Sequence, residues 1–328
     1  MLRRHGLSER RIIEIMTSLQ DRMPGNPLPF GDDVSAVRIG KGRLAALKCD
    51  MLVGSTDIPK GMSFWQASRK AVVASISDLA AKGVKPQAVL ASLGLPRSLG
   101  ERDIHQIGSG LNSGAREYGA YVLGGDTNES TDLVIDVSAF GFCGGSELVR
   151  RDTANVGDIV AVTGDFGLTT LGLRIIKEGL EVPKKLRREA TSAVFKPRAR
   201  LREGLALSKD HLATASIDSS DGLAWSLYEL AKSSRVGFEI ENLPIHRGVE
   251  EYALNSGFNA AELALYGGEE YELVVTIKPT GFEKAKRRVS TLTRVGRVTG
   301  ESGKVTLNSE GRVYRVRRRG YEHLRNHF

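Results

Sequence analysis

Carboxylate side chains recur along this chain beside glycine and other small residues, in segments typical of turns or element ends. The members of this set are Asp32, Asp33, Asp50, Asp78, Asp126, Asp218 and Asp221. The chain carries a net charge of +8, so acids grouped in this way are not ordinary surface charge. Hard divalent cations such as Mg²⁺ prefer oxygen ligands, usually one or two carboxylates each together with substrate phosphates. The set therefore indicates a metal site that serves a nucleotide.

The segment FGDD places two adjacent carboxylates, Asp32 and Asp33, in a turn. Glycine and aspartate are turn residues, so a plain β-turn is one interpretation. Adjacent carboxylates repel, however, and cations between them and a polyphosphate explain the pair better. Asp50, inside the strand-like run RLAALKCDMLV, is open to both interpretations, because an aspartate at a strand end often only starts a turn.

Asp78 is harder to explain as a purely structural residue. Aspartate is unfavourable inside helices because its side chain competes for backbone hydrogen bonds. Residues 65–82 have helical spacing, and Asp78 shares one helix face with Ala71, Ala74 and Ser75. Such small neighbours permit the close approach of a ligand, so a functional role is favoured.

Three further segments combine glycine with acids or hydroxyls. LGGDT leads a strand into a turn at Gly125 and Asp126, where backbone can approach a ligand; a tight turn alone is the alternative. SIDSSDGL places Asp218, Ser220 and Asp221 at a helix start, as caps, as Mg²⁺ ligands beside a phosphate, or as both. VTGDFGLTTLGL has the order of strand, glycine turn and helix that binds anions through backbone amides.

Other signatures of nucleotide and hydrolytic enzymes are missing. The chain has no Gly-Lys-Ser/Thr P-loop ending, no GxGxxG in a βαβ setting and no protein-kinase motif set. Its six histidines suggest no Ser-His-Asp or Cys-His arrangement, so covalent catalysis is not indicated. The two cysteines, Cys49 and Cys143, lie far apart in strand-like runs, which predicts two buried thiols and no zinc site or disulfide.

The length of 328 residues favours two domains, and 41% hydrophobic and 26% charged residues are typical of a soluble globular protein. No stretch has the apolar length of a membrane span or a secretory signal, so we expect no membrane partner and a cytoplasmic location. The densest basic run, RVYRVRRRG, alternates with apolar residues like a solvated strand face. Nucleic-acid binding is not expected, since no signature of it accompanies the charge.

Alternating helical and strand patterns predict an α/β protein. For the first half we expect a helix over 8–20 capped by Ser8, strands over 43–53, 87–96, 121–127 and 133–144, and helices over 65–82 and 101–119. For the second half we expect strands over 158–164 and 271–277, the latter alternately buried, and helices from about 168, over 201–210 and over 223–235. A polar stretch near 146–158 separates the predicted domains, 1–148 and 149–328. Gly-Gly-acid segments at Asp126 and Glu269 hint that the halves are related.

The order of the motifs FGDD, CDMLV, SISDLAAKG, LGGDT, VRRDTANVGD, VTGDFGLTTLGL, SIDSSDGL and YGGEEYEL closely resembles the thiamine-monophosphate kinase family. That family belongs to the aminoimidazole-ribonucleotide-synthetase-like group of ATP enzymes, and the resemblance runs from about residue 30 to RGYEHL. It implies two α/β domains, the first with a four-stranded sheet that pairs with its copy in a homodimer. The implied reaction transfers the γ-phosphoryl group of ATP directly to thiamine monophosphate, giving thiamine diphosphate and ADP.

The resemblance also implies residue roles by position. Several Mg²⁺ ions are implied on Asp33, Asp50, Asp78, Asp126, Asp218 and Asp221, with Asp33, Asp78, Asp126 and Asp221 as the catalytic group. ATP contacts are implied at Gly125, Asp126, Arg151 and Ser220, and substrate contacts at Asp57, Glu269 and Arg318. The ions and Arg151 would cancel the repulsion between two anionic reactants. An acceptor phosphate is already ionised, so the reaction needs positioning and electrostatic stabilisation more than a general base.

The acceptor side departs from the family pattern. Cys49 stands where many members have Thr, Asp57 or a neighbour where bacterial members have His, and Arg318 where an aromatic residue is common. Phe64, Trp65 and Tyr271 are either stacking partners for a thiamine ring or core residues. The alternatives are a purine-pathway synthetase, an enzyme of the selenophosphate-synthetase type, whose N-terminal Cys is missing here, and a noncatalytic nucleotide- or RNA-binding module.

Overall fold

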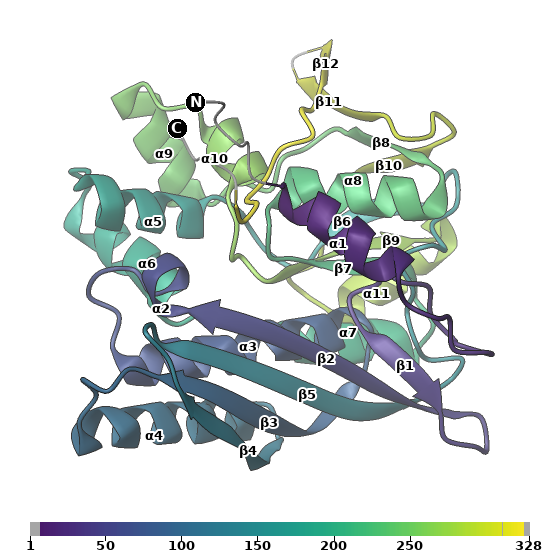
Figure 1. The fold of residues 1–328 in the computed structure, drawn as a ribbon. Helices are drawn as coiled ribbons and strands as arrows, with labels where there is room; N and C mark the ends of the chain where they lie inside the picture. The colour runs from purple at the N-terminus through teal and green to yellow at the C-terminus, as the bar shows by residue number, and fades with distance from the viewer. Residues whose placement is uncertain (1–6, 310, 325–328) are drawn as a thin grey trace, which may run out of the picture.

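The computed structural model describes residues 7–309 and 311–324, which form two α/β units, each built on its own sheet (Figure 1). The chain begins with α1 (Glu9–Ser18), which lies against the second unit through the contact of Arg10 with Glu229 (Figure 1). The first unit contains β1 (Ser35–Arg38), β2 (Arg43–Val53), α2 (Gly54–Asp57), α3 (Phe64–Ala81), β3 (Lys85–Leu95), α4 (Glu101–Glu117), β4 (Tyr121–Glu129) and β5 (Val134–Gly144). The second contains β6 (Ile159–Val162), α5 (Leu168–Glu178), α6 (Lys184–Phe195), α7 (Leu201–Lys209), β7 (Ala213–Ser219), α8 (Leu223–Ser234), β8 (Gly237–Ile240), α9 (Arg247–Ser256), α10 (Ala260–Tyr266), β9 (Glu272–Ile277), α11 (Phe282–Arg288), β10 (Thr293–Thr299), β11 (Val305–Ser309) and β12 (Arg312–Arg315). The expected α/β class is confirmed.

The first sheet has five strands in the order β1-β2-β5-β3-β4, so the expectation of four strands was wrong. The additional strand, β1, is a four-residue edge strand that pairs antiparallel with β2. It follows the FGDD turn directly, and this fixes Asp33 at the sheet margin.

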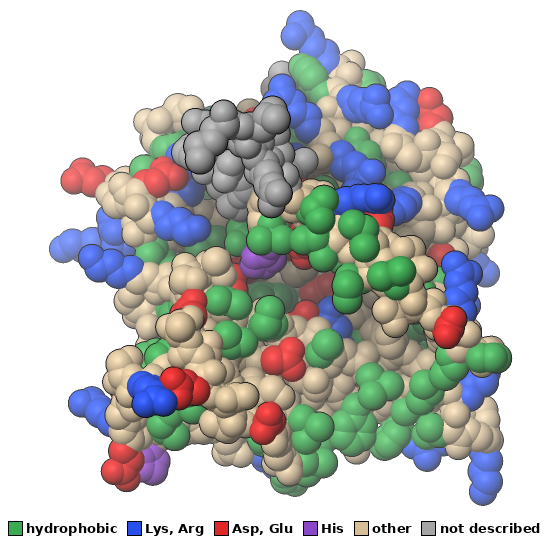
Figure 2. Space-filling view, in the orientation of Figure 1, with side chains coloured by type: hydrophobic (Ala, Val, Ile, Leu, Met, Phe, Trp, Pro, Cys, Tyr) green, Lys and Arg blue, Asp and Glu red, His purple; other side chains and the backbone are tan. Residues whose placement is uncertain are grey.

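Helices α3 and α4 pack on one face of the first sheet, and the opposite face carries exposed apolar side chains. Leu47, Met51, Leu90, Tyr121 and Leu123 are 46% to 66% exposed there, and Figure 2 shows hydrophobic side chains over this half of the molecule. Cys49 is exposed on the same face, so the prediction of two buried thiols was wrong for this residue and holds for Cys143. Odd-numbered positions of β2 point away from the helices, which is why Cys49 escapes burial.

The second sheet has seven strands in the order β12-β11-β8-β10-β6-β9-β7. Every residue of β9 is buried, whereas the sequence predicted an alternating pattern. The reason is that β9 is flanked by β6 and β7 and packed on both faces, by α8 residues such as Leu227 and by residues such as Leu207 of α7 and Ala285 of α11. No described helix is long and apolar enough to cross a membrane.

Helix α3 joins the two units. Ser63 and Gln66 form a capping box at its start, and nearly all of its residues are buried between the first sheet, α4 and α7. Glycines allow the close contacts: a Cβ on Gly110 of α4 would lie 2.3 Å from the carbonyl oxygen of Trp65, and one on Gly204 of α7 would lie 1.9 Å from that of Ala80. The predicted helix over 65–82 is therefore confirmed, and it is the central packing element.

Gly204→Ala is expected to lower the free energy of unfolding by about 3 kcal/mol, because the added methyl group overlaps backbone that belongs to α3. Urea-induced unfolding followed by circular dichroism would measure the change. Gly108→Ala is the matched control, since a Cβ at this exposed position in α4 meets no atom within 4 Å and alanine favours helix. Equal stability of the two variants would contradict the packing argument.

Three boundaries bear on the site. Ser8 accepts a hydrogen bond from the Arg11 amide, as expected for the cap of α1. LGGDT is not a turn, because β4 continues through it to Glu129 as the parallel partner of β3. SIDSSDG is only partly a turn, because β7 extends to Ser219 and Asp218 lies in the strand.

Candidate active site

Three carboxylates from distant segments meet between the two units. They are Asp33 of the FGDD turn, Asp78 of α3 and Asp218 of β7; one oxygen atom from each lies within 4.8 Å of the others, and all three residues are buried. Ser77 donates a hydrogen bond of 2.8 Å to Asp218. Figure 2 shows acidic and basic side chains together in the hollow between the two halves of the molecule.

Asp50 of β2 extends this cluster through Lys48. The Lys48 ammonium lies 3.1 Å from Asp50 Oδ1 and 3.1 Å from Asp78 Oδ2. The other Asp50 oxygen is buried and accepts no hydrogen bond from a described residue. Lys48 and Asp50 share one face of β2 because they are two residues apart, and the contact of Lys48 with Asp78 shows that this face is towards α3.

Burial is the largest single influence on the pKa values of Asp33, Asp78, Asp218 and Asp221. It raises the pKa of Asp78 well above its usual range, in spite of Lys48, and raises the pKa of Asp218 to about 6, with a further contribution from Asp33. It also raises the pKa of Asp221 to about 7, where Glu9 and Asp218 add to the effect. Burial has the same tendency at Asp33, but Arg151 and Lys82 outweigh it and lower the pKa. A bound cation would favour the ionised form of all four.

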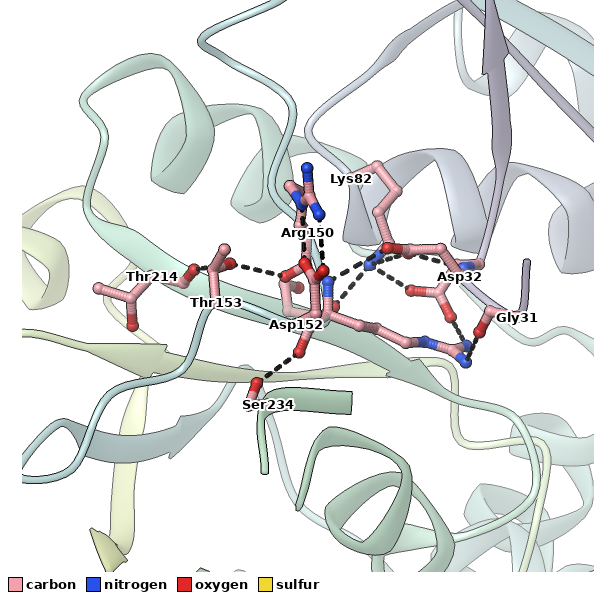
Figure 3. A network of polar contacts seen from close by, with 11 residues as sticks. Gly31, Asp32, Lys82, Arg150, Asp152, Thr153, Thr214 and Ser234 are labelled. Carbon is pink, nitrogen blue, oxygen red and sulfur yellow. Dashed lines mark hydrogen bonds and ion pairs between the residues drawn. The ribbon is translucent and has the colours of Figure 1, made fainter. Parts of the chain in front are cut away.

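A buried polar network holds the FGDD turn in place (Figure 3). The fully buried Lys82 ammonium lies 2.8 Å from Asp32, 2.7 Å from Asp33 and 2.6 Å from the carbonyl oxygen of Ser216 in β7. Arg151 forms an ion pair with Asp33 and donates its backbone N–H to Asp32 at 3.2 Å. These contacts join the turn, the end of α3 and the second unit, so they fix where Asp33 points.

The start of α8 lies beside the cluster. Gly222 occupies the N-cap position, and no side chain caps this helix, so the simple capping role considered for Asp218, Ser220 and Asp221 is not what the structure has. The Ser220 carbonyl accepts the Glu269 amide at 2.6 Å. Glu269 has a φ of 65°, an unfavourable value for a residue with a side chain. The backbone at YGGEEY is therefore held in a strained form next to α8.

The segment around Glu269 contacts the first unit through Lys70. The buried Lys70 ammonium pairs with Glu269 and donates to the Asp57 carbonyl at 3.1 Å. The Asp57 carboxylate itself accepts hydrogen bonds from the Val53 amide and the Thr56 hydroxyl, within the turn of α2. Tyr321 lies close by: burial raises its pKa, and Asp57 and Glu269 raise it further.

A cleft of about 1030 Å³ opens on the other side of Glu269. Its walls include Gly164, Asp165, Arg200 and His246. The cluster of aspartates does not line this cleft, whereas Glu269 lines it and also contacts the Ser220 carbonyl and Lys70.

The glycine turn of VTGDFGLTT does not offer free amides to an anion. Glu270 accepts hydrogen bonds from the Gly167 amide at 2.7 Å and the Thr169 hydroxyl at 2.9 Å, so a carboxylate already occupies the start of α5. Burial raises the pKa of Glu270 to about 7. The anion-binding interpretation of this turn is therefore not supported.

Two groups of candidate residues lie away from the cluster. Gly125 and Asp126 are exposed on the edge strand β4; a Cβ on Gly125 would lie 1.7 Å from the Ala91 carbonyl oxygen, so glycine is required there by strand packing. Arg318 reaches Glu229 of α8 at 3.4 Å and lies over Trp225. Within one chain the structure brings neither Asp126 nor Arg318 to Asp78.

Four residues near the site were not predicted from the sequence, namely Lys48, Lys70, Lys82 and Tyr321. Lys48 had a signal, because it precedes Asp50 by two residues and must share its strand face. No sequence signal marked Lys70 or Lys82, because a lysine in a helix is usually solvated. Tyr321 also had a signal, because it lies in the motif RGYEHL, three residues after Arg318.

The residue types fit a hard divalent cation. All donors in the cluster are carboxylate oxygens, which Mg²⁺ prefers, and one buried Asp50 oxygen accepts no hydrogen bond from the described residues. No histidine or cysteine joins the cluster among the described residues, as a softer metal would favour.

Comparison with known proteins defines the class first. Residues 31–143 match the family model "AIR synthase related protein, N-terminal domain", and residues 155–308 match its C-terminal counterpart. The chain is thus a two-domain AIR synthase related protein. A thiamine-monophosphate kinase of Pyrococcus horikoshii is 38% identical over 90% of this chain and 91% of its own length, and one of Nitrosopumilus maritimus is 35% identical over 97% and 99%. The chain belongs to the thiamine-monophosphate kinase family.

A solved structure agrees with this assignment. It is described as AaThiL complexed with AMPPCP and TMP, and it superposes on this chain with a TM-score of 0.84 at 28% identity, covering 98% of this chain and 99% of its own. AMPPCP and TMP are thus the molecules bound in that related structure.

Proposed function

We propose that this protein transfers the γ-phosphoryl group of ATP to thiamine monophosphate, giving thiamine diphosphate and ADP, in a Mg²⁺-dependent reaction. The observation that carries the proposal is the meeting of Asp33, Asp78 and Asp218 within 4.8 Å in a chain whose full-length relatives are thiamine-monophosphate kinases. A purine-pathway or selenophosphate-type reaction has no such support from these relatives.

Asp33, Asp78 and Asp218 would hold Mg²⁺, with Asp50 and Asp221 at the margins of the same group. When bound, Mg²⁺ would neutralise the charge on the transferring phosphates. Arg151, which pairs with Asp33, and Ser220, two residues after Asp218, remain the proposed ATP contacts. Lys82 and Arg151 orient Asp33 before any ligand arrives, which reduces the reorganisation that transfer requires.

The acceptor would bind on the Glu269 side. The polar surroundings of Glu269 support this placement, because it pairs with Lys70, lies near Tyr321 and lines the adjoining cleft. Asp57 is proposed to shape these surroundings through its backbone contact with Lys70, since its carboxylate is used within α2. The acceptor phosphate needs no base, so the task of these side chains is to align it.

We further propose that two copies associate through the uncovered face of the first sheet. The exposed apolar side chains there support it, as does the position of Asp126, which lies three strands from Asp50, roughly 14 Å at normal strand spacing. A second copy would supply its own Asp126 to the site. Mixed dimers of inactive Asp78→Asn and Asp126→Asn chains are then expected to recover about a quarter of wild-type turnover, because one site per mixed dimer is intact. No recovery after mixing and refolding would contradict the proposal that the partner copy supplies Asp126 to the site.

The reaction is tested by following thiamine diphosphate and ADP by chromatography with ATP, Mg²⁺ and thiamine monophosphate. Equal amounts of the two products are expected, and none without Mg²⁺. ADP release that does not depend on thiamine monophosphate, or product only with an aminoimidazole precursor or selenide, would overturn the proposal.

Stabilisation by Mg²⁺ is expected to disappear at acid pH. The pKa values of Asp218, about 6, and Asp221, about 7, exceed their ordinary values, so the metal-free folded protein binds these protons more tightly than the unfolded chain does. Its stability should therefore fall as pH rises from about 4 to 7. Mg²⁺ competes with these protons for the same carboxylates. At 10 mM Mg²⁺, about a hundred times an assumed Kd of 0.1 mM, the rise in Tm caused by the metal should therefore be large at pH 8 and small at pH 5. An equal rise at both values would contradict the assignment.

A further inference from the structure

Lys48 occupies a position between carboxylates that a metal ion would otherwise take. Its ammonium lies 3.1 Å from Asp50 Oδ1 and 3.1 Å from Asp78 Oδ2, so it bridges β2 and α3. The side chain is 23% exposed, and that of Asp78 is 10% exposed. The bridge is therefore largely shielded from solvent.

Lys48 is the cation that the structure places between these two carboxylates. A Mg²⁺ ion placed between the same two oxygen atoms would have to push this cation aside. Displacement would leave a partly buried ammonium without its partners, which is costly, and Mg²⁺ gives up its water shell reluctantly.

We propose that Lys48 is the resident cation of the Asp50–Asp78 pair, staying between the two carboxylates while Mg²⁺ binds on the side of the cluster formed by Asp33, Asp78 and Asp218. The chain then takes up one divalent ion fewer than its carboxylates would otherwise hold. This inference rests on the Mg²⁺-dependent site proposed above. Lys82 does not share this role, because its partners are Asp32, Asp33 and the Ser216 carbonyl and include neither Asp50 nor Asp78.

The number of bound ions tests the inference. Mn²⁺ is titrated into the full-length protein with a saturating non-hydrolysable ATP analogue, and free Mn²⁺ is followed by electron paramagnetic resonance. Lys48→Gln is expected to bind one more Mn²⁺ per chain than the wild type. Without metal, its Tm in EDTA should be lower, and its rise on adding Mg²⁺ larger, because Asp50 and Asp78 then lack a counter-ion. Lys304→Gln, which removes the same charge from an exposed pair with Glu301, should match the wild type in all three measurements.

A second measurement needs no variant. Anomalous scattering from wild-type crystals soaked in Mn²⁺ should show ions near Asp33 and Asp218 and none between Asp50 and Asp78. A peak between those two residues would mean that metal displaces the ammonium, and so would an unchanged ion number with tighter binding in Lys48→Gln. Either result would overturn the inference about Lys48 and leave the proposed Mg²⁺ site standing. Failure of every protein, wild type included, to bind Mn²⁺ would overturn the metal site and the inference together.

Discussion

Replacing Asp78 with asparagine is expected to reduce the rate of phosphoryl transfer about a thousandfold, which corresponds to about 4 kcal/mol in the activation free energy. Asparagine keeps the shape of the side chain and removes the negative charge that would hold the cation. Asp78 is the member of the cluster with the fewest structural duties: it lies on α3, and the one ion-pair partner that the structure gives it, Lys48, also pairs with Asp50.

The fold should survive this change. Burial raises the pKa of Asp78 well above its usual range, so the ionised side chain is a burden to the metal-free protein, and its loss should change the free energy of unfolding by less than about 1 kcal/mol. Steady-state ADP release with saturating ATP, Mg²⁺ and thiamine monophosphate gives the rate, and thermal unfolding gives the stability. Asp21→Asn, in an exposed part of the loop before FGDD, should behave like the wild type. Turnover of Asp78→Asn within a few-fold of wild type would remove Asp78 from the metal site.

Lys82→Met is expected to lower the free energy of unfolding by about 3–5 kcal/mol, the usual cost of leaving a buried charge without its partner. Methionine has a similar length but no charge, so Asp32 and Asp33 would lose their shared cation and the Ser216 carbonyl its donor (Figure 3). Arg151 would still pair with Asp33, which leaves Asp32 as the carboxylate most exposed to the loss. Chemical denaturation measures the effect.

A double variant separates this cause from simple misfit of the methionine. Lys82→Met with Asp32→Asn should regain part of the lost stability, because the second change removes the uncompensated charge. Lys85→Met, three residues along and exposed, should stay within about 0.5 kcal/mol of the wild type. Equal losses in the single and double variants would show that the charge of Lys82 is not what stabilises the turn.

Local patterns predicted the individual elements well where they are long. The helix over 65–82, the strand that contains Asp50 and the Ser8 cap follow from side-chain periodicity and capping chemistry, which depend on neighbours a few residues away. The same reasoning failed at LGGDT and at the start of α5. Glycine marks a turn in sequence, but Gly125 serves the contact of β4 with β3, and Glu270 comes from a segment about one hundred residues away.

The amino-acid sequence by itself determined the family, the α/β class and the kind of chemistry, because an ordered set of acidic motifs and element periods can be read without knowing distances. Only the tertiary structure decided which acids meet. Strand order separates Asp126 from Asp50, whereas the packing of α3 against both sheets brings Asp78 to Asp33 and Asp218. It also placed Lys48 and Lys82 among those acids. Such meetings depend on contacts between segments far apart in the chain, and local spacing carries no record of them.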